Sequence, residues 1–284
     1  MKECVLYKKL DDKKVKCTAC KHFCVISKGK YGICGVRKNV DGKLHLEVYE
    51  KPIAVAIDPI EKKPLRRFMP GTRIFSIGTV GCNFKCDFCQ NADISQVRQE
   101  DRYSVELSPE EIVDYCIENN IPLIAYTYNE PTIFFEYTYD TAKLANQKGI
   151  KNVYVSNGYY SAEAIKKISP YLDAINIDLK AFTDEFYKKI CGAKLENVLD
   201  SIKYTYKLGI WVEITTLLVP DENDSIEEIT KIAEFIKSVD EEIPWHVSAF
   251  RPAYKMLDRK SMSYKKVERA VKIGKEVGLR YVYG

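Results

Sequence analysis

Two groups of closely spaced cysteines are the residues of this 284-residue sequence whose types and spacing suggest chemistry. Seven of the ten cysteines belong to them: Cys17, Cys20, Cys24 and Cys34 in the first group, and Cys82, Cys86 and Cys89 in the second. No secretory leader is recognisable, so we expect a reducing, cytoplasmic location. In such a compartment, clustered cysteines indicate metal ligands or reactive thiols more often than disulfides.

The second group has the spacing Cys-x3-Cys-x2-Cys, with Phe88 before its last cysteine. Three thiolates this close can bind three corners of a 4Fe-4S cluster, which normally needs a fourth thiolate. No fourth cysteine follows at a suitable spacing. One iron would be left for a ligand from outside the protein, which indicates a reactive centre. A zinc knuckle or a chance arrangement is the alternative.

The first group offers four thiolates, a closed ligand shell for structural zinc or for a second 4Fe-4S cluster. Spacing alone does not choose the metal. The interleaved glycines resemble a zinc knuckle and the segment lacks a hydrophobic core, so we favour zinc slightly. A cluster is favoured if electrons must be relayed, and a disulfide pair is a third alternative. Of the remaining cysteines, we expect Cys116 and Cys191 to be small buried hydrophobic residues.

Strand-like and helix-like segments alternate from residue 73 onward. The expected strands are residues 73–79, 123–128, 152–156, 174–178, 211–219, 245–249 and 280–283. The expected helices are residues 109–119, 132–148, 161–168, 183–190, 195–208, 225–239 and 263–277. Capping boxes at Ser108–Glu111 and Ser225–Glu228 begin two of these helices. The pattern predicts an α/β fold, a partial (β/α)6 TIM-like barrel whose working residues lie at the carboxyl ends of its strands.

Residues 1–72 differ in composition and form a predicted N-terminal module, with the barrel spanning residues 73–284. The module contains the four cysteines and an expected hairpin at residues 41–48. Residues 51–72 are rich in proline, and we expect them to wrap over the barrel. Few apolar residues of the module could build a core, so a metal would have to stabilise it.

Composition excludes several classes of protein. The chain is 46% hydrophobic and 30% charged, which is typical of a globular protein. A net charge of +4 argues against a dedicated nucleic-acid binder, and no apolar run is long enough to cross a membrane. Residues 1–72 carry +9 and the remainder −5. The basic part either docks an acidic partner or is a solvated surface.

The second cysteine motif resembles that of the radical S-adenosylmethionine (SAM) superfamily. Residues 20–26, 32–37, 57–65 and 126–131 narrow the resemblance to the AmmeMemoRadiSam-system radical SAM enzymes, which are related to pyruvate formate-lyase activating enzymes. The resemblance covers nearly the whole chain. It implies a 4Fe-4S cluster on Cys82, Cys86 and Cys89, with SAM on the open iron.

The same resemblance assigns residues to SAM. Glu130 would accept from the SAM ammonium group, and Lys180 would pair with its carboxylate beside Asp178. Asn157 would make a polar contact with SAM, or it is an ordinary turn residue. Side chains two apart on a strand face the same way, so Asp178 and Lys180 can both reach the barrel interior. A surface glutamate and a plain strand-end ion pair are the alternatives.

Two further assignments concern residues of the fifth and sixth expected strands, where Glu213 is expected to point into the barrel. His246 would lie near SAM, as a histidine does in the related activating enzymes, or it is a core histidine with a satisfied ring. Glu213 would contact the SAM ribose.

The implied activity is reductive cleavage of SAM to methionine and a 5′-deoxyadenosyl radical, which abstracts hydrogen from a substrate. The implied electron donor is a ferredoxin or flavodoxin of low potential. The substrate is a partner protein, as for the activating enzymes, or a tyrosine- or anion-bearing small molecule or peptide. Aromatic residues at 126–139 would line the substrate mouth or belong to the core, and Arg251 would hold an anion or lie on the surface. An iron-sulfur electron carrier is the non-enzymatic alternative.

Overall fold

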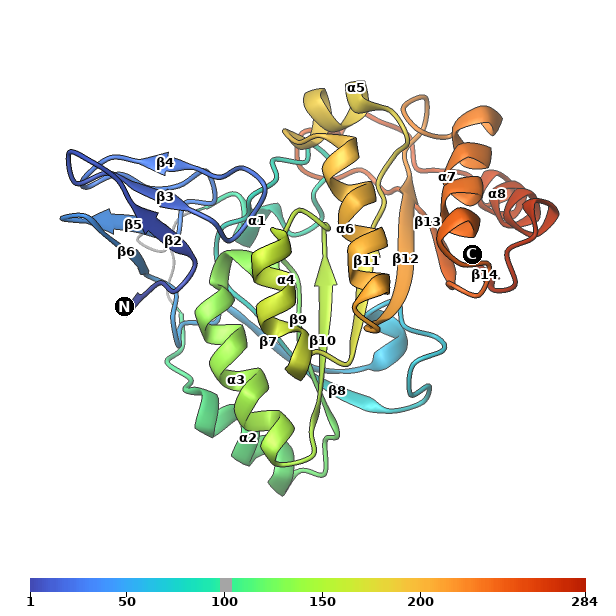
Figure 1. Cartoon of the computed structure of the whole chain (residues 1–284). Helices are drawn as coiled ribbons and strands as arrows, with labels where there is room; N and C mark the ends of the chain where they lie inside the picture. Colours follow the sequence, from blue (N-terminus) through green and yellow to red (C-terminus); the bar gives the residue numbers. More distant parts are fainter. Residues whose placement is uncertain (98–103) are drawn as a thin grey trace.

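In the computed structural model, which describes residues 1–97 and 104–284, the chain folds around one eight-stranded sheet (Figure 1). Seven strands run parallel: β8 (Arg73–Gly78), β9 (Leu123–Tyr126), β10 (Lys151–Ser156), β11 (Ala174–Asp178), β12 (Trp211–Leu218), β13 (Trp245–Ala249) and β14 (Val282–Tyr283). Strands β8 to β13 are the six of the predicted partial barrel, and the short β14 extends it.

Helices follow the parallel strands along the chain, as predicted. The longer ones are α2 (Pro109–Glu118), α3 (Phe135–Gln147), α4 (Ala162–Ile168), α6 (Leu195–Lys207), α7 (Ile226–Val239) and α8 (Tyr264–Val277). Shorter turns are η1 (Ile60–Lys62), α1 (Ala92–Ser95), η3 (Pro131–Phe134), η4 (Ser169–Tyr171), α5 (Asp184–Phe186) and the π-helix η5 (Tyr187–Cys191). The capping box at Ser108–Glu111 is confirmed. Ser225 also caps its helix, but Glu228 accepts from the Phe182 backbone N–H instead.

The N-terminal module contains two small antiparallel sheets, beside α3 and α4 in Figure 1. One consists of β1 (Lys2–Glu3), β6 (Lys43–Leu46) and β5 (Arg37–Val40), and the other of β2 (Tyr7–Lys9), β3 (Val15–Cys17) and β4 (Val25–Ile26). The predicted hairpin is β5–β6. Its turn residues Asp41 and Gly42 have φ of 52° and 88°, as the right-handed strand twist favours in a two-residue turn.

Residues 51–72 enter the barrel rather than wrap over it, which corrects the prediction. Strand β7 (Ala54–Pro59) pairs antiparallel with β8 at the edge of the large sheet. The segment after it, residues 60–69, packs Ile60 and Leu65 against inward-facing residues of β8 to β11. We call residues 60–69 the plug segment, because they fill the base of the barrel. Their apolar side chains replace a solvent-filled interior with a packed one.

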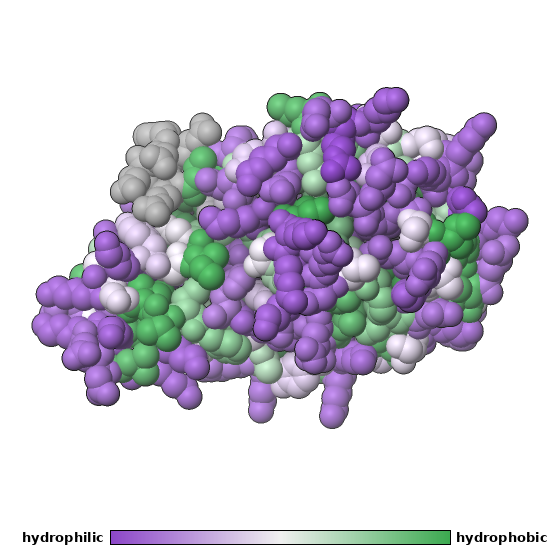
Figure 2. All heavy atoms as spheres, turned by 90° about the horizontal axis from the view of Figure 1, so that it is seen from above, coloured by the Kyte–Doolittle hydropathy of each residue, from purple (hydrophilic) through white to green (hydrophobic). Residues whose placement is uncertain are grey.

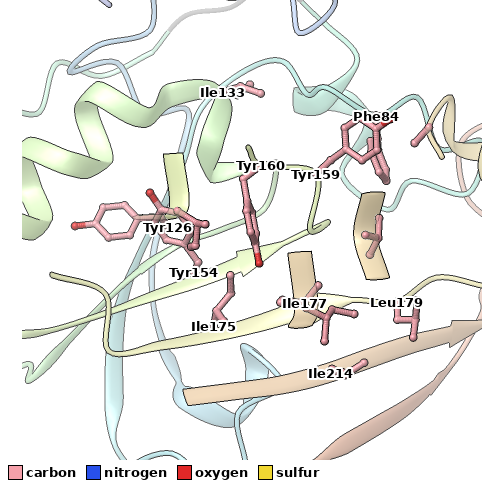
Figure 3. Packing of buried hydrophobic residues seen from close by; sticks show 14 of the residues in the cluster. Phe84, Tyr126, Ile133, Tyr154, Tyr159, Tyr160, Ile175, Ile177, Leu179 and Ile214 are labelled. Atoms are coloured by element: carbon pink, nitrogen blue, oxygen red, sulfur yellow. The ribbon is translucent and has the colours of Figure 1, made fainter. Parts of the chain in front are cut away.

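The outer face of the sheet packs against the helices through large apolar side chains. Figure 3 shows Tyr126 and Tyr154 on adjacent strands, and their rings meet edge to face with centroids 5.6 Å apart. Their buried hydroxyls are satisfied by Asn152 and Thr138. Because side chains alternate between the two faces of a strand, the residues next to each tyrosine along β9 and β10 point into the barrel.

The face seen in Figure 2 is covered mostly by hydrophilic side chains, with hydrophobic ones in small separate groups. Among the described residues, we find no helix that combines the length and hydropathy required to span a bilayer.

Candidate active site

A cavity of about 390 Å³ opens at the carboxyl ends of the parallel strands, and we call it the strand-end cavity. Seven residues singled out in the sequence line it: Cys82, Cys86, Cys89, Glu130, Asn157, Asp178 and Lys180. They follow or end four neighbouring strands, β8 to β11. The fold therefore brings together residues that are far apart in the chain, as the strand-end rule for barrels predicts.

The loop that contains the three cysteines is fixed by backbone hydrogen bonds. Lys85 N–H donates to the Cys191 carbonyl (2.9 Å), and Asp87 N–H donates to the Ile190 carbonyl (3.1 Å). Within residues 1–97 and 104–284, no other cysteine lines the strand-end cavity. No group of three His, Cys, Asp or Glu side chains in those ranges is arranged to hold a single metal ion. Three thiols spread around one cavity fit the separate corners of a 4Fe-4S cluster, with one corner left open.

Cys191 lies beside Cys86, a neighbour that the sequence did not indicate. It is fully buried, as predicted, but it is not an isolated hydrophobic residue. A hydrogen bond between the two thiols, together with burial, raises the pKa of Cys86. Cys191 ends the π-helix η5, and one-turn π-helices occur often at functional sites. The sequence pattern predicted an ordinary helix there, so this contact could not be found from spacing.

Glu130 is a buried carboxylate with fixed orientation, which excludes the alternative of a surface residue. It is 1% exposed. Its Oε1 accepts from Thr132 N–H (3.1 Å), and its Oε2 accepts from Asn157 N–H (2.8 Å). The Ser156 hydroxyl lies 3.0 and 2.9 Å from the two oxygens. Burial raises the pKa of Glu130, so a cation in the cavity would stabilise its ionised form.

Asn157 combines the two roles considered for it. Its Oδ1 accepts from Tyr159 N–H (3.0 Å), which is the hydrogen bond of a turn asparagine. Its Nδ2 donates to Asn83 Oδ1 (2.8 Å) and lies 4.0 Å from Cys82 Sγ. The side chain thus connects the end of β10 to the cysteine loop while it lines the cavity.

Lys180 places a positive charge in the cavity. Its Nζ lies 2.8 Å from Asp178 Oδ2. Burial alone would lower the pKa of Lys180, but Asp178 together with the thiols of Cys86 and Cys191 outweighs burial and holds that pKa above its ordinary range. The ion pair does exist, and both of its members line the strand-end cavity.

Glu213 and His246 lie at the base of the barrel and not in the strand-end cavity. Glu213 is fully buried and accepts from the backbone N–H groups of residues 66, 67 and 68 at 3.0, 2.9 and 3.2 Å. It also accepts from Trp211 Nε1 (3.1 Å) and lies 2.6 Å from His246 Nε2. Glu213 faces inward as predicted, but it holds the plug segment, and His246 pairs with Glu213. Their position therefore does not support the predicted contacts with SAM.

The plug segment adds two lysines to the cavity wall that sequence reasoning missed. Lys62 and Lys63 both line it. Lys63 is 4% exposed, with its Nζ 2.9 Å from Asp58 Oδ2 and 4.7 Å from the ring centroid of Tyr128. Tyr128 has a φ of 70°, which is rare for a bulky residue and occurs where surrounding structure imposes it. The signal was present in residues 57–65, which were noted only as a family resemblance.

Most of the other aromatic candidates belong to the core. Tyr126, Phe134, Phe135 and Tyr137 are buried away from the cavity, and Tyr139 stacks on Phe135. Tyr128 is the one member of the predicted aromatic patch that lines the strand-end cavity, and Arg251 is exposed outside it.

The four N-terminal cysteines also come together. Cys17, Cys20, Cys24 and Cys34 line a second, smaller pocket, which we call the four-cysteine pocket. His22 lines it as well, but its Nε2 lies 2.9 Å from the Asn83 carbonyl oxygen. The predicted set is therefore one spatial group, adjacent to the loop of the other three cysteines.

Comparison with known proteins agrees with this geometry. The sequence profile of the radical SAM superfamily matches residues 76–236, which include the cysteine loop, Glu130 and Lys180. The chain belongs to the radical SAM superfamily. It is also related to the pyruvate formate-lyase-activating enzymes: the enzyme of Clostridium pasteurianum is 25% identical over 214 residues, 69% of this chain and 88% of that one.

Two other relatives show how far the similarity extends. An uncharacterized protein of Methanocaldococcus jannaschii is 45% identical over 284 residues, which is 100% of this chain and 84% of that protein. The crystal structure of a radical SAM methyltransferase from Sphaerobacter thermophilus matches with a TM-score of 0.58 at 14% identity, over 76% of this chain and 67% of that one. The structural match establishes a shared fold.

Proposed function

We propose that this protein is a radical SAM oxidoreductase of the AmmeMemoRadiSam-system type, similar to the activating enzymes of glycyl radical enzymes. The observation that supports this proposal is a single cavity lined by three thiols, the buried carboxylate of Glu130 and the partly buried ammonium group of Lys180. When bound there, a 4Fe-4S cluster and SAM would supply the reductive cleavage that gives methionine and a 5′-deoxyadenosyl radical for hydrogen abstraction.

The protein residues would bind and orient these groups. Cys82, Cys86 and Cys89 would hold three irons. The amino-acid end of SAM has an ammonium and a carboxylate group, and Glu130 and Lys180 offer the opposite charge to each. Charge-assisted hydrogen bonds of this kind are stronger than neutral ones, and fixed partners orient a ligand as well as bind it. Asn157 would add a polar contact beside Cys82.

Glu213 and His246 would act indirectly. They anchor the plug segment across the base of the barrel. A closed base keeps water from entering behind the cavity, and water exclusion protects a reactive radical from side reactions.

Two classes of substrate fit the proposal. A glycyl radical enzyme is one, by similarity to the activating enzymes. The second is a small molecule or peptide with an anionic group, which Lys62 and Lys63 in the cavity wall favour. In either case the enzyme would need a one-electron donor of low potential, a ferredoxin or a flavodoxin, and the basic N-terminal module offers it a surface of complementary charge.

An iron-sulfur electron carrier is the less favoured alternative. Such a protein encloses its cluster with a full set of protein ligands. The strand-end cavity instead has three thiols and additional space lined by charged groups.

Anaerobic reconstitution with iron and sulfide tests the proposal. With dithionite and SAM, the wild-type protein should form 5′-deoxyadenosine and methionine, measured by chromatography. Cys86→Ala should abolish the product. Cys116→Ala is the matched control, because Cys116 is a buried cysteine of α2 outside both groups, and it should retain the product. If the wild-type protein held an intact cluster but did not cleave SAM, the proposed enzymatic activity would be contradicted and the electron-carrier alternative supported.

A further inference from the structure

The four-cysteine pocket is built from separate pieces of the N-terminal module. Cys17 ends β3, Cys20 and Cys24 lie in the connection to β4, and Cys34 precedes β5. Antiparallel pairing of β2, β3 and β4 brings the first three together, and Cys17 N–H donates to the Cys24 carbonyl (2.9 Å). Strands of two to four residues cannot hold such a loop-rich arrangement by backbone pairing alone, so a bound metal would stabilise it.

The arrangement of the cysteines disfavours a single ion. Zinc holds four ligands at about 2.0–2.3 Å from one point, so its cysteines must converge closely. Across residues 1–97 and 104–284, neither group of cysteines is arranged to hold one metal ion. The three cysteines of the strand-end cavity provide an internal standard, since they have the motif of a 4Fe-4S cluster. Cys17, Cys20, Cys24 and Cys34 likewise surround a pocket without converging on one metal position, which favours a cluster over the zinc that the glycines suggested.

Asn83 gives the pocket an unused donor. It is 1% exposed and lines the four-cysteine pocket. Its Oδ1 accepts from Asn157, whereas its Nδ2 has no hydrogen-bond partner among the described residues. A buried N–H group without an acceptor destabilises the fold, so it indicates a missing partner. The sulfurs of an anionic cluster would accept this hydrogen bond.

The two groups of cysteines share a wall. A Cβ added to Gly81 would lie 2.4 Å from the Cys34 carbonyl oxygen and 2.8 Å from Val36 Cγ1. Gly81 precedes Cys82, and Asn83 follows it. The residue before Cys82 is therefore in contact with the backbone of Cys34, and the residue after Cys82, Asn83, lines the four-cysteine pocket.

We infer that Cys17, Cys20, Cys24 and Cys34 bind a second 4Fe-4S cluster, that Asn83 donates a hydrogen bond to it, and that it relays electrons to the first cluster. One electron would leave a reduced ferredoxin or flavodoxin, reduce the second cluster, and pass to the first, with no bond made or broken. The relay rests on the proposed function, but binding of the second cluster does not.

Metal analysis of a variant without the first cluster tests the site. Cys82→Ala/Cys86→Ala/Cys89→Ala, reconstituted anaerobically, should contain about four irons and four sulfides per chain and be brown, against about eight of each in the wild type. It should give an electron paramagnetic resonance signal after reduction with dithionite. A colourless protein with about one zinc, or one without metal, would overturn the proposal. Because SAM cleavage is not measured, failure of the proposed function would leave this result unchanged.

Single substitutions in the otherwise wild-type protein provide the second arm. Cys17→Ser and Cys34→Ser should each lower the iron content to about half. Cys4→Ser should leave it unchanged, because Cys4 is a buried cysteine of the same module that does not line the pocket. Loss of iron in Cys4→Ser to the same extent would show general unfolding of the module and contradict the ligand assignment.

The part of Asn83 is tested by the reduction potential of the triple variant. Hydrogen bonds to cluster sulfurs raise the potential, so adding Asn83→Ala should make it more negative at unchanged iron content. An unchanged potential would show that Asn83 does not donate to the cluster. The relay itself would fail if Cys17→Ser kept wild-type rates of SAM cleavage with reduced flavodoxin as the donor.

Discussion

At the scale of single residues, the strand-end cavity is defined by two fixed and opposite charges. Glu130 is oriented by hydrogen bonds from the ends of β9 and β10, and Lys180 by Asp178. A ligand with one charge would gain from only one of these groups. The amino-acid end of SAM would gain from both, and this complementarity can be tested one charge at a time.

Lys180→Met should weaken SAM binding by about 10–100-fold, because a hydrogen bond to a charged group contributes about 1.5–3 kcal/mol. The dissociation constant can be measured by equilibrium dialysis on the reconstituted protein. Lys62→Met is the matched control, since Lys62 also lines the cavity but its side chain is 68% exposed, against 12% for Lys180. Equal losses in the two variants would mean that Lys180 has no specific role.

Sequence reasoning found these charged residues because they follow strands that are recognisable by their apolar patterns. It predicted the correct face of the strand for Glu213, but for neither Glu213 nor His246 did it predict the layer of the barrel in which the side chain lies. A period of two determines on which side of a sheet a side chain lies, and it says nothing about which layer of the barrel it occupies. Thr215 and Leu217, further along the same face of β12 than Glu213, line the cavity.

At the scale of the elements, the seven parallel strands and most helix boundaries were predictable from periodicity and capping residues. The plug segment and the π-helix η5 were not. The plug segment has no periodic pattern and is held by backbone N–H groups that donate to Glu213. The π-helix differs from an α-helix by a single inserted residue, which leaves the hydrophobic spacing nearly unchanged.

Glu213→Gln should lower the free energy of unfolding by about 2–3 kcal/mol, because an amide presents an N–H₂ group to donors that need an acceptor. Urea denaturation measures the loss. Glu61→Gln is the matched control, since Glu61 accepts one N–H from Gly71 at the exposed end of the same region. It should change stability by no more than about 0.5–1 kcal/mol.

The effect of Glu213 should also depend on pH. Burial raises its pKa, but hydrogen bonds from His246, Trp211 and the backbone of Arg66 outweigh burial and hold it below the ordinary 4.5. A lowered pKa means that the stabilisation is complete above pH 4.5 and is lost as pH falls through the folded-state value. The difference between wild type and Glu213→Gln should therefore shrink on acidification below about pH 4.5. A difference that grows on acidification would contradict this assignment.

Gly81→Ala should disturb the contact between the N-terminal module and the cysteine loop. Gly81 has a φ of 84°, and a Cβ there would collide with the backbone oxygen of Cys34, which cannot rotate away. Gly149 has a φ of 75°, and a Cβ added there would have no heavy atom within 4 Å. Gly149→Ala therefore has only the cost of placing alanine in a left-handed conformation, about 1–2 kcal/mol. We expect Gly81→Ala to cost at least about 1–3 kcal/mol more in unfolding experiments, and to bind less iron. Equal costs would show that the loop can move aside.

At the scale of the whole molecule, one buried ion pair fastens the N-terminal module to the barrel. Arg37 Nη2 of β5 lies 2.6 Å from Glu136 Oε2 of α3, and both side chains are 2% exposed. Arg37 Nε also donates to the Ile133 carbonyl, and Glu136 accepts from Val5 N–H. Arg37 also lines the four-cysteine pocket, so its side chain connects that pocket to α3.

Arg37→Met should destabilise the protein by about 3–5 kcal/mol, because it leaves the Glu136 carboxylate buried without its partner. The double variant Arg37→Met/Glu136→Leu removes the unpaired charge as well, and it should recover about 1–3 kcal/mol relative to Arg37→Met alone. Lys2 and Asp140 provide a matched control, since they join the same module to the same helix at 2.9 Å but are exposed. Lys2→Met should cost less than about 1 kcal/mol. If Arg37→Met cost no more than Lys2→Met in urea denaturation, the buried pair would not be what holds the module, and the cysteine loop would have to be positioned by the Gly81 contact alone.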